Sequence, residues 1–184
     1  MKTIISTIAL TFFSIAIFAQ VDGKKFPELE AEKIDDTVIS IPKDVSDKYT
    51  LVALAYSKKS EKDLETWLIP LYNTFIYKPD KPTMFAAFAY DIHVFIIPMF
   101  TGVNAAAKGI AKKKAAEGLD PKLHNNLLFY KGELKKYKKE LEFDKRDVPY
   151  IFVIDKSGTI VYSTSGAYSE AKMDAIETEV GKDD

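Results

Sequence analysis

Two serines stand three positions apart, at Ser57 and Ser60, where the apolar run "YTLVALAY" gives way to the polar stretch "SKKSEKD". A serine hydroxyl attacks a substrate only when a neighbouring group removes its proton. Lys58, Lys59 and Lys62 are close in sequence, but exposed lysines are protonated near neutral pH and are poor bases. We therefore expect neither serine to be catalytic.

The cap itself has a sequence signature. Ser60 and Asp63 match the pattern S-x-x-D, which is close to a capping box. We therefore expect Ser60 to cap the helix. Ser57 is then either the position of a former nucleophile or a plain loop serine.

Other residue types exclude several kinds of chemistry. The chain has no cysteine, which excludes disulfides, thiolate metal sites, thiol catalysis and a lipid on an N-terminal cysteine. The two histidines, His93 and His124, are too far apart to match a local metal-ligand spacing. There is no glycine-rich nucleotide-binding motif. We therefore expect neither a metal nor a cofactor.

The charges are distributed unevenly along the 184 residues, although the net charge is only −1. Residues 108–146 hold twelve Lys and Arg against six Asp and Glu, and residues 147–184 hold three against eight. Lys112, Lys113 and Lys114 stand at the centre of the basic part. They form either a solvated helix face or a docking surface for an anionic membrane or an acidic partner. The small net charge and the export signal described next argue against nucleic acid.

Residues 1–19 have the features of a signal peptide. Lys2 precedes the apolar stretch "IISTIALTFFSIAIF", and Ala19 offers a small residue for cleavage. We expect export to the periplasm or the medium, with Gln20 as the first residue of the mature chain. The alternative is an uncleaved anchor, because Ile17 is bulkier than the residue preferred at that position.

The first half of the mature chain predicts two strands and a helix. Residues 37–41 alternate and end at Pro42, as in an edge strand, and residues 49–57 form a continuous apolar run, as in a buried parallel strand. The next apolar residues have helical spacing, with a kink expected at Pro70. These residues are Leu64, Trp67, Leu68, Leu71, Tyr72 and Phe75.

The middle of the chain predicts a strand and two helices. Residues 83–90 read as a buried strand, and residues 91–100 as its continuation into a turn or short helix. A membrane span over residues 84–100 would bury Asp91 and His93, which is costly in lipid. An alanine-rich basic helix follows to Gly118. Residues 121–141 then show apolar residues at helical spacing, which predicts a long amphipathic helix.

The last part predicts a strand, a tight turn, a strand and a helix. The strand "VPYIFVID" is followed by "DKSG", in which Gly158 supplies the positive φ of a hairpin turn. "TIVYSTSG" returns, and "SEAKMDAIETEV" closes the chain with Ala171, Ile176 and Val180 on its inner face.

This order resembles the thioredoxin-like proteins, in which a cis proline opens a strand, a hairpin and a glycine follow, and a final helix closes the domain. Pro149, Gly158 and Gly166 match those parts. "YTLVALAYSKKSEKD" is similar to the segment that carries the two redox cysteines, with Ser57 and Ser60 at the cysteine positions. The resemblance implies one α/β domain over residues 20–184, a mixed sheet flanked by helices, with a helical insert at about 98–142.

A second resemblance is to the mitochondrial ATP-synthase assembly factors built on this fold. It rests on Trp67, Pro70, the long helical insert and the segment "PYIFVIDKSGTI". Many of those proteins also lack the redox motif.

The resemblance implies a groove that binds an extended peptide through backbone hydrogen bonds. Its residues would be Tyr56, Ser57, Ser60, Val148 and Pro149, with a cis Val148–Pro149 bond and with Tyr56 as a partly exposed apolar wall. We therefore expect an exported, redox-inactive binding or assembly protein. The alternatives are a cysteine-independent enzyme that uses Ser57 and a membrane-surface protein that acts through its basic helices.

Overall fold

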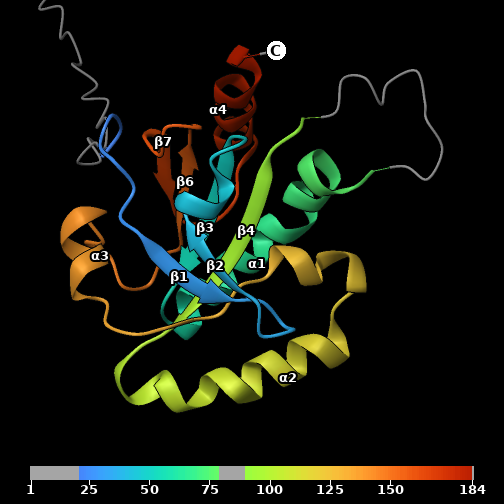
Figure 1. The fold of residues 1–184 in the computed structure, drawn as a ribbon, viewed down its shortest axis with the longest axis vertical. Helices are drawn as coiled ribbons and strands as arrows, with labels where there is room; N and C mark the ends of the chain where they lie inside the picture. The colour runs from blue at the N-terminus through green and yellow to red at the C-terminus, as the bar shows by residue number, and fades with distance from the viewer. Residues whose placement is uncertain (1–20, 79–89, 184) are drawn as a thin grey trace, which may run out of the picture.

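A five-stranded mixed sheet forms the centre of the molecule, in the order β5-β4-β3-β6-β7 (Figure 1). The computed structural model describes residues 21–78 and 90–183. The strands of the sheet are β3 (Thr50–Ala55), β4 (His93–Phe100), β5 (Tyr130–Lys131), β6 (Tyr150–Ile154) and β7 (Ile160–Ser165). β4 runs parallel to both β3 and β5, whereas β6 is antiparallel to β3 and β7. The predicted mixed sheet is therefore confirmed.

The central strand β3 requires that both faces of the sheet be covered. All six of its residues are buried. Leu51 and Ala53 contribute to one hydrophobic cluster, and Val52 and Leu54 to another. Because successive side chains of a strand point to opposite faces, a continuous apolar run is stable only between two layers.

One face is covered by α1 (Lys58–Leu71) and α4 (Glu170–Val180), which pack apolar residues on the sheet. Trp67 is fully buried, and its indole N–H donates to the carbonyl of Gly166 at 3.0 Å. On α4 the inner residues include Ile176 and Val180 as expected, but Ala171 is exposed and Met173 is the buried residue.

The other face is covered by a small antiparallel hairpin, β1 (Leu29–Glu32) and β2 (Val38–Ile41), and by α3 (Lys135–Glu140). Figure 1 shows the hairpin crossing this face, with α3 at its side and α2 (Lys108–Gly118) along the lower edge. The edge strand expected over residues 37–41 is thus present, in its own two-stranded sheet.

Two predictions for the middle of the chain are wrong. Residues 93–100 are not a turn or short helix but the strand β4, paired with β3 from Thr50↔His93 to Ala55↔Pro98. The long helix expected over residues 121–141 is absent. In its place are a 3-10 helix (Pro121–Asn126), the short strand β5 and α3. Pairing of this segment with β4 supplies backbone hydrogen bonds that override the helical spacing, for example from Leu128 N–H to the Ile96 carbonyl at 3.0 Å.

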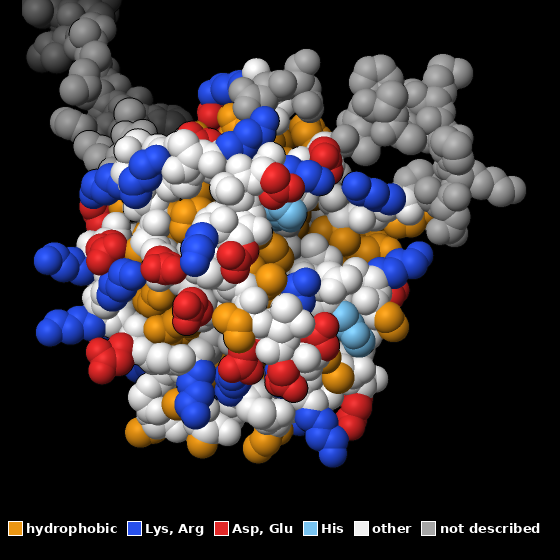
Figure 2. Space-filling model, viewed as in Figure 1, with side chains coloured by type: hydrophobic (Ala, Val, Ile, Leu, Met, Phe, Trp, Pro, Cys, Tyr) orange, Lys and Arg blue, Asp and Glu red, His pale blue; other side chains and the backbone are white. Residues whose placement is uncertain are grey.

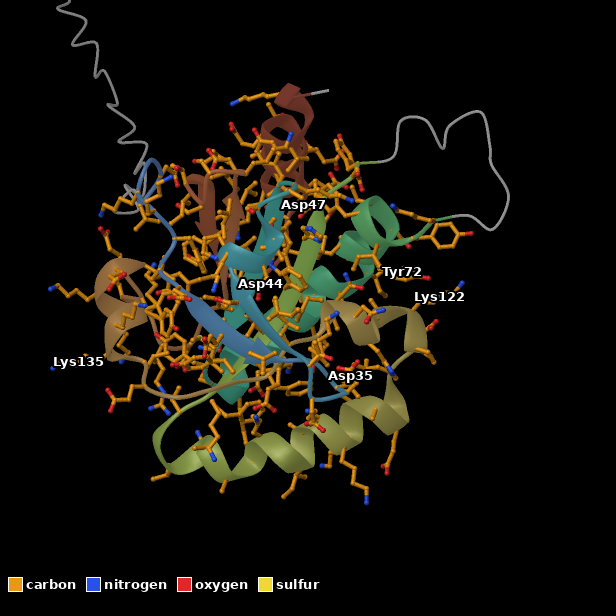
Figure 3. All side chains as sticks on the ribbon, in the orientation of Figure 1. Asp35, Asp44, Asp47, Tyr72, Lys122 and Lys135 are labelled. Atoms are coloured by element: carbon orange, nitrogen blue, oxygen red, sulfur yellow. The ribbon has the colours of Figure 1, made fainter. Side chains whose placement is uncertain are left out.

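The alanine-rich segment is helical, as predicted. A 3-10 helix (Gly102–Ala107) leads directly into α2. Two of its lysines tie α2 to the β1–β2 hairpin. Lys108 pairs with Glu32 at 2.6 Å, and Lys112 pairs with Asp36 and, at 3.5 Å, with Glu32. Figure 3 shows the neighbouring Asp35 at the end of this hairpin, beside α2.

Within the described ranges, no helix is long and apolar enough to cross a membrane. The expected signal peptide, residues 1–19, lies outside the described residues, as does nearly all of the strand expected over residues 83–90.

Candidate functional site at the Pro149 end of the sheet

The two serines form a reciprocal capping box at the start of α1. Ser57 is the N-cap, and its hydroxyl accepts from the Ser60 N–H at 3.1 Å. The Ser60 hydroxyl accepts in return from the Ser57 N–H at 2.9 Å and from the Tyr56 N–H at 3.1 Å. The predicted cap of Ser60 with Asp63 is therefore wrong by one turn. The helix begins at Lys58, so the residue three positions after its cap is Ser60 rather than Asp63.

These contacts decide what the serine hydroxyls can do. Ser60 is fully buried, and its hydroxyl donates to the Ser57 carbonyl at 2.9 Å. The Ser57 hydroxyl lies 3.2 Å from Ser60 Oγ and 3.3 Å from a carboxylate oxygen of Asp147. Asp147 is exposed, and a carboxylate is a weaker base than the histidine that activates the serine of a catalytic triad. The arrangement stabilises a helix start and provides no strong base for Ser57.

Tyr56 is not the partly exposed wall expected from the sequence. Its side chain is only 7% exposed, and its ring stacks on Phe143 with centroids 5.5 Å apart. The phenol donates to the Lys145 carbonyl at 3.1 Å, and burial raises the pKa of this phenol to about 12. The reason is the loop before β6, which folds back over Tyr56 and covers its ring.

That loop is held by a second tyrosine. The Tyr150 ring stacks on Phe143 with centroids 4.5 Å apart, so Phe143 stacks on both phenol rings. The Tyr150 hydroxyl accepts from the Lys145 N–H at 2.7 Å and donates to the Lys145 carbonyl at 3.1 Å. Three stacked rings and two hydroxyls thus fix the chain that leads into Val148 and Pro149.

The Val148–Pro149 bond is trans, and the predicted cis bond is wrong. Within residues 21–78 and 90–183, the one cis peptide bond is Ile41–Pro42. The trans form is the more stable by about 0.5–1 kcal/mol at an X–Pro bond. Pro149 is buried and its carbonyl accepts from the Gly166 N–H at 2.9 Å, so the trans chain enters the sheet with this ladder bond made.

The predicted groove residues do lie at one end of the sheet. Leu54 is the register partner of Tyr150, which places the residues after β3 beside those before β6. The Ser57–Asp147 contact closes the same corner, and Val148 is half-buried against the cluster that contains Tyr56. Of the five predicted residues, Ser57 and Val148 remain partly accessible, and the other three are buried.

An open pocket of about 500 Å³ lies beside this corner, where β3, β4 and β5 end. The carboxyl ends of parallel strands are the usual place for ligands in open α/β sheets. Tyr56 is on its wall, and its charged lining residues are Glu133 and the three cations Lys135, Lys138 and Arg146. The Lys138 ammonium stands 5.8 Å from the centre of the Tyr56 ring. Figure 3 shows Lys135 at the outer side of α3.

These pocket cations are not among the site residues predicted from the sequence. They come from α3 and from the loop before β6, and nothing in the local sequence distinguishes them from the other lysines of the basic region. The only signal was the excess of positive charge over residues 108–146.

The three lysines proposed for surface docking do not share one environment. Lys112 is 12% exposed and ion-paired with Glu32 and Asp36. Lys113 is 78% exposed and stands 3.9 Å from Glu117, and Lys114 is exposed. Of these three lysines, only Lys113 and Lys114 therefore face solvent.

The two histidines have structural partners. His93 lies 2.8 Å from Asp47 and stacks on Phe95, and its hydrogen bond lowers the pKa of the Asp47 carboxyl. Figure 3 labels Asp47 at this end of the sheet, opposite the pocket. His124 lies 3.2 Å from the Leu119 carbonyl. Among the described residues, no group of three or more metal-binding side chains comes together.

Comparison with known proteins supports the fold. No family model matches the chain, and no curated protein matches it. Solved structures do. The chain is similar to the thioredoxin domain of a thiol-disulfide oxidoreductase from Bacteroides vulgatus, with TM-score 0.59, 20% identity and coverage of 87% of this chain and 98% of that one.

Two further solved structures are similar to this chain. A thiol:disulfide interchange protein from Bacteroides sp. gives TM-score 0.55 at 17% identity, with 86% of this chain and 90% of that chain covered. A putative thiol:disulfide interchange protein DsbE from Chlorobium tepidum gives 0.52 at 15% identity, with 86% and 94% covered. At these identities the likeness establishes the fold and not the activity. This chain is therefore a thioredoxin-fold protein without cysteine.

Proposed function

We propose that this chain is an exported, redox-inactive binding or assembly protein that holds a peptide or protein partner at the Pro149 end of the sheet. The observation that carries the proposal is the open pocket at the ends of β3, β4 and β5. Its cations favour a partner segment with an acidic or carbonyl-rich face.

The serine pair supports a role without electron transfer. Thiol-disulfide exchange needs a thiolate, and this chain has no sulfur nucleophile. The hydroxyls of Ser57 and Ser60 instead form the hydrogen bonds that cap α1. The thioredoxin fold is retained, and the groups that remain available for binding at this end of the sheet are charged side chains and the backbone.

A binding experiment tests the proposal. A fluorescently labelled short peptide rich in aspartate and glutamate should bind the purified protein saturably, and a neutral peptide of equal length should not. Lys138→Gln should weaken binding about fivefold, because an exposed ion pair contributes up to about 1 kcal/mol. Lys139→Gln is the matched control, since Lys139 is exposed on the same helix but does not line the pocket.

Equal weakening by Lys138→Gln and Lys139→Gln would contradict the proposal, since the peptide would then sense only the overall charge of α3. A cysteine-independent enzyme that uses Ser57 is the competing function. An activity that survives purification and is lost in Ser57→Ala, with the helix content unchanged, would favour it.

Docking of α2 on an anionic membrane is a second candidate, favoured by exposed apolar residues on α2 and on the 3-10 helix that leads into it. Val103 is 97% exposed and Ile110 is 64% exposed, and Lys113 and Lys114 follow them. Figure 2 shows hydrophobic and basic side chains together along the lower edge of the molecule, where α2 lies. Apolar residues beside lysines are the composition of a helix that lies on a membrane.

Co-sedimentation with liposomes tests this docking. The protein should bind vesicles that contain phosphatidylserine and not those made of phosphatidylcholine alone. Replacing Lys113 and Lys114 with Gln should weaken the free energy of binding to the vesicles by about 2 kcal/mol, at about 1 kcal/mol for each lysine. Lys112→Gln should change it little, because Lys112 faces Glu32. Equal binding to both kinds of vesicle would reject the docking.

A further inference from the structure

A second cavity, of about 200 Å³, lies between α1 and the segment 119–127. Its walls are almost entirely apolar. They are formed by Leu64, Leu68, Ile96, Pro98, Leu119, Leu123 and Leu127. An apolar cavity of about 150 Å³ can hold a benzene molecule, whereas pockets for drug-sized ligands usually exceed about 300 Å³. This cavity therefore has room for one short aliphatic group.

The cavity is separate from the site proposed above. Leu64 and Ile96 belong to the hydrophobic cluster on the α1 side of the sheet, whereas Tyr56 belongs to the cluster on the hairpin side. The segment that closes the cavity is held to β4 by backbone pairing of Ile96 with Leu127. It is also held to the chain after α1, where the Lys122 ammonium stands 6.0 Å from the centre of the Tyr77 ring. Figure 3 shows Lys122 and Tyr72 on these two segments.

The polar lining consists of two carboxylates, Glu61 and Glu65. They are four residues apart on α1, so they lie on one face of the helix and repel each other. Glu65 is exposed, and within residues 21–78 and 90–183 neither carboxylate has a hydrogen bond or an ion pair within 4 Å. Glu61 is half-buried, and burial raises its pKa, while the nearby charge of Lys58 acts in the opposite direction. The cavity therefore combines an apolar interior with an excess of negative charge.

We propose that this cavity binds a small primary amine. Its aliphatic chain occupies the leucine-lined interior, and its ammonium group lies between the carboxylates of Glu61 and Glu65. The ammonium donates charge-assisted hydrogen bonds and relieves the repulsion between the two acids. An anion of the same size is repelled, and a neutral chain gains only the apolar contribution. A single unbranched chain of about five carbons is similar in size to benzene and therefore fits this volume.

Titration with n-alkylammonium chlorides, followed by amide chemical shifts of the purified protein, tests the proposal. n-Pentylammonium should bind saturably and move the signals of Leu64, Leu68 and Leu123. Affinity should rise about fourfold for each methylene from propyl to pentyl, the effect of about 0.8 kcal/mol for each buried methylene. n-Pentanol should bind at least tenfold more weakly than n-pentylammonium, because it has no charge for the two acids to pair.

Three variants locate the site. Glu61→Gln should weaken n-pentylammonium about tenfold and leave n-pentanol unchanged. Glu170→Gln is the matched control, because Glu170 also occupies the first turn of its helix but is remote from the cavity. Leu123→Trp should fill the cavity and abolish both. Equal effects of Glu61→Gln and Glu170→Gln, or an affinity that does not depend on chain length, would overturn the proposal. So would binding of a lysine-containing peptide at these residues without binding of the free amine.

Discussion

The side-chain geometry of Ser57 and Ser60 can be tested by replacing both serines with cysteine. Their hydroxyl oxygens lie 3.2 Å apart, so two sulfurs at these positions could reach bonding distance through a small rotation of the side chains. We expect the double variant Ser57→Cys, Ser60→Cys to form an intramolecular disulfide under mild oxidation, detected by the loss of alkylation by iodoacetamide. The thiol of the single variant Ser57→Cys should remain fully reactive toward iodoacetamide. A folded double variant that keeps two reactive thiols would show that the side chains diverge.

Tyr56 belongs to the core, which changes the expected cost of replacing it. Tyr56→Ala should lower the free energy of unfolding by about 3–5 kcal/mol, the usual range for a large buried aromatic residue. Tyr56→Phe should cost only about 1 kcal/mol, because it removes the hydrogen bond to the Lys145 carbonyl and keeps the ring. Urea denaturation measures both. A loss below 2 kcal/mol for Tyr56→Ala would mean that the loop before β6 does not cover the ring in solution.

At the scale of elements, α2 is attached to the β1–β2 hairpin by charge. The hydrogen bond from Lys108 is the main cause that holds the pKa of Glu32 below its ordinary value of 4.5. A carboxyl with a lowered pKa stabilises the folded state above its unfolded-state pKa. That contribution is lost as the pH falls through the folded-state pKa. We therefore expect this attachment to weaken in acid, below about pH 4.5.

Lys108→Gln isolates the effect. The pKa of Glu32, measured by NMR titration, should rise toward 4.5 in this variant. Lys113→Gln should leave it unchanged, because Lys113 stands near Glu117 on α2 itself. If both variants moved the pKa of Glu32 equally, the shift would come from the general charge of α2 and not from the Lys108 contact.

The elements that could be predicted from the sequence are those with local signals. β3 and β6 show as apolar runs. Gly158 marks the hairpin turn with its φ of 79°, and β7 is the strand that returns after this turn. β4 could not be recognised because Pro98 interrupts its run, and the structure places that proline where β3 ends. The helix predicted over residues 121–141 failed because pairing with β4 is a long-range contact that periodicity cannot report.

The candidate site divides in the same way. Proximity of Tyr56 and Ser57 to Val148 and Pro149 followed from the resemblance of two local segments. The cations of the pocket could not be found, since Lys135 and Arg146 meet only through the packing of α3 and the loop before β6. Burial of Tyr56 depends on the same loop and could not be predicted from the sequence either.

For the whole molecule, the expected export predicts a definite mass. Expression with the native N-terminus in a bacterial host should give a protein outside the cytoplasm that lacks residues 1–19 and begins at Gln20. Intact mass spectrometry of the fraction outside the cytoplasm measures this directly. A protein that keeps residues 1–19 would show an uncleaved anchor instead.

Trp67 is the only tryptophan of the chain, and it lies fully buried on α1 with its indole N–H bonded to the carbonyl of Gly166 and its ring at 90° to that of Tyr168. The protein thus contains one tryptophan fluorophore, placed where the first long helix meets the segment that leads into the last. Its emission should be blue-shifted in the native protein and should move to the red when this junction opens. Because Gly166 and Tyr168 both precede α4, the same signal reports separation of the C-terminal helix from the sheet, with no added dye.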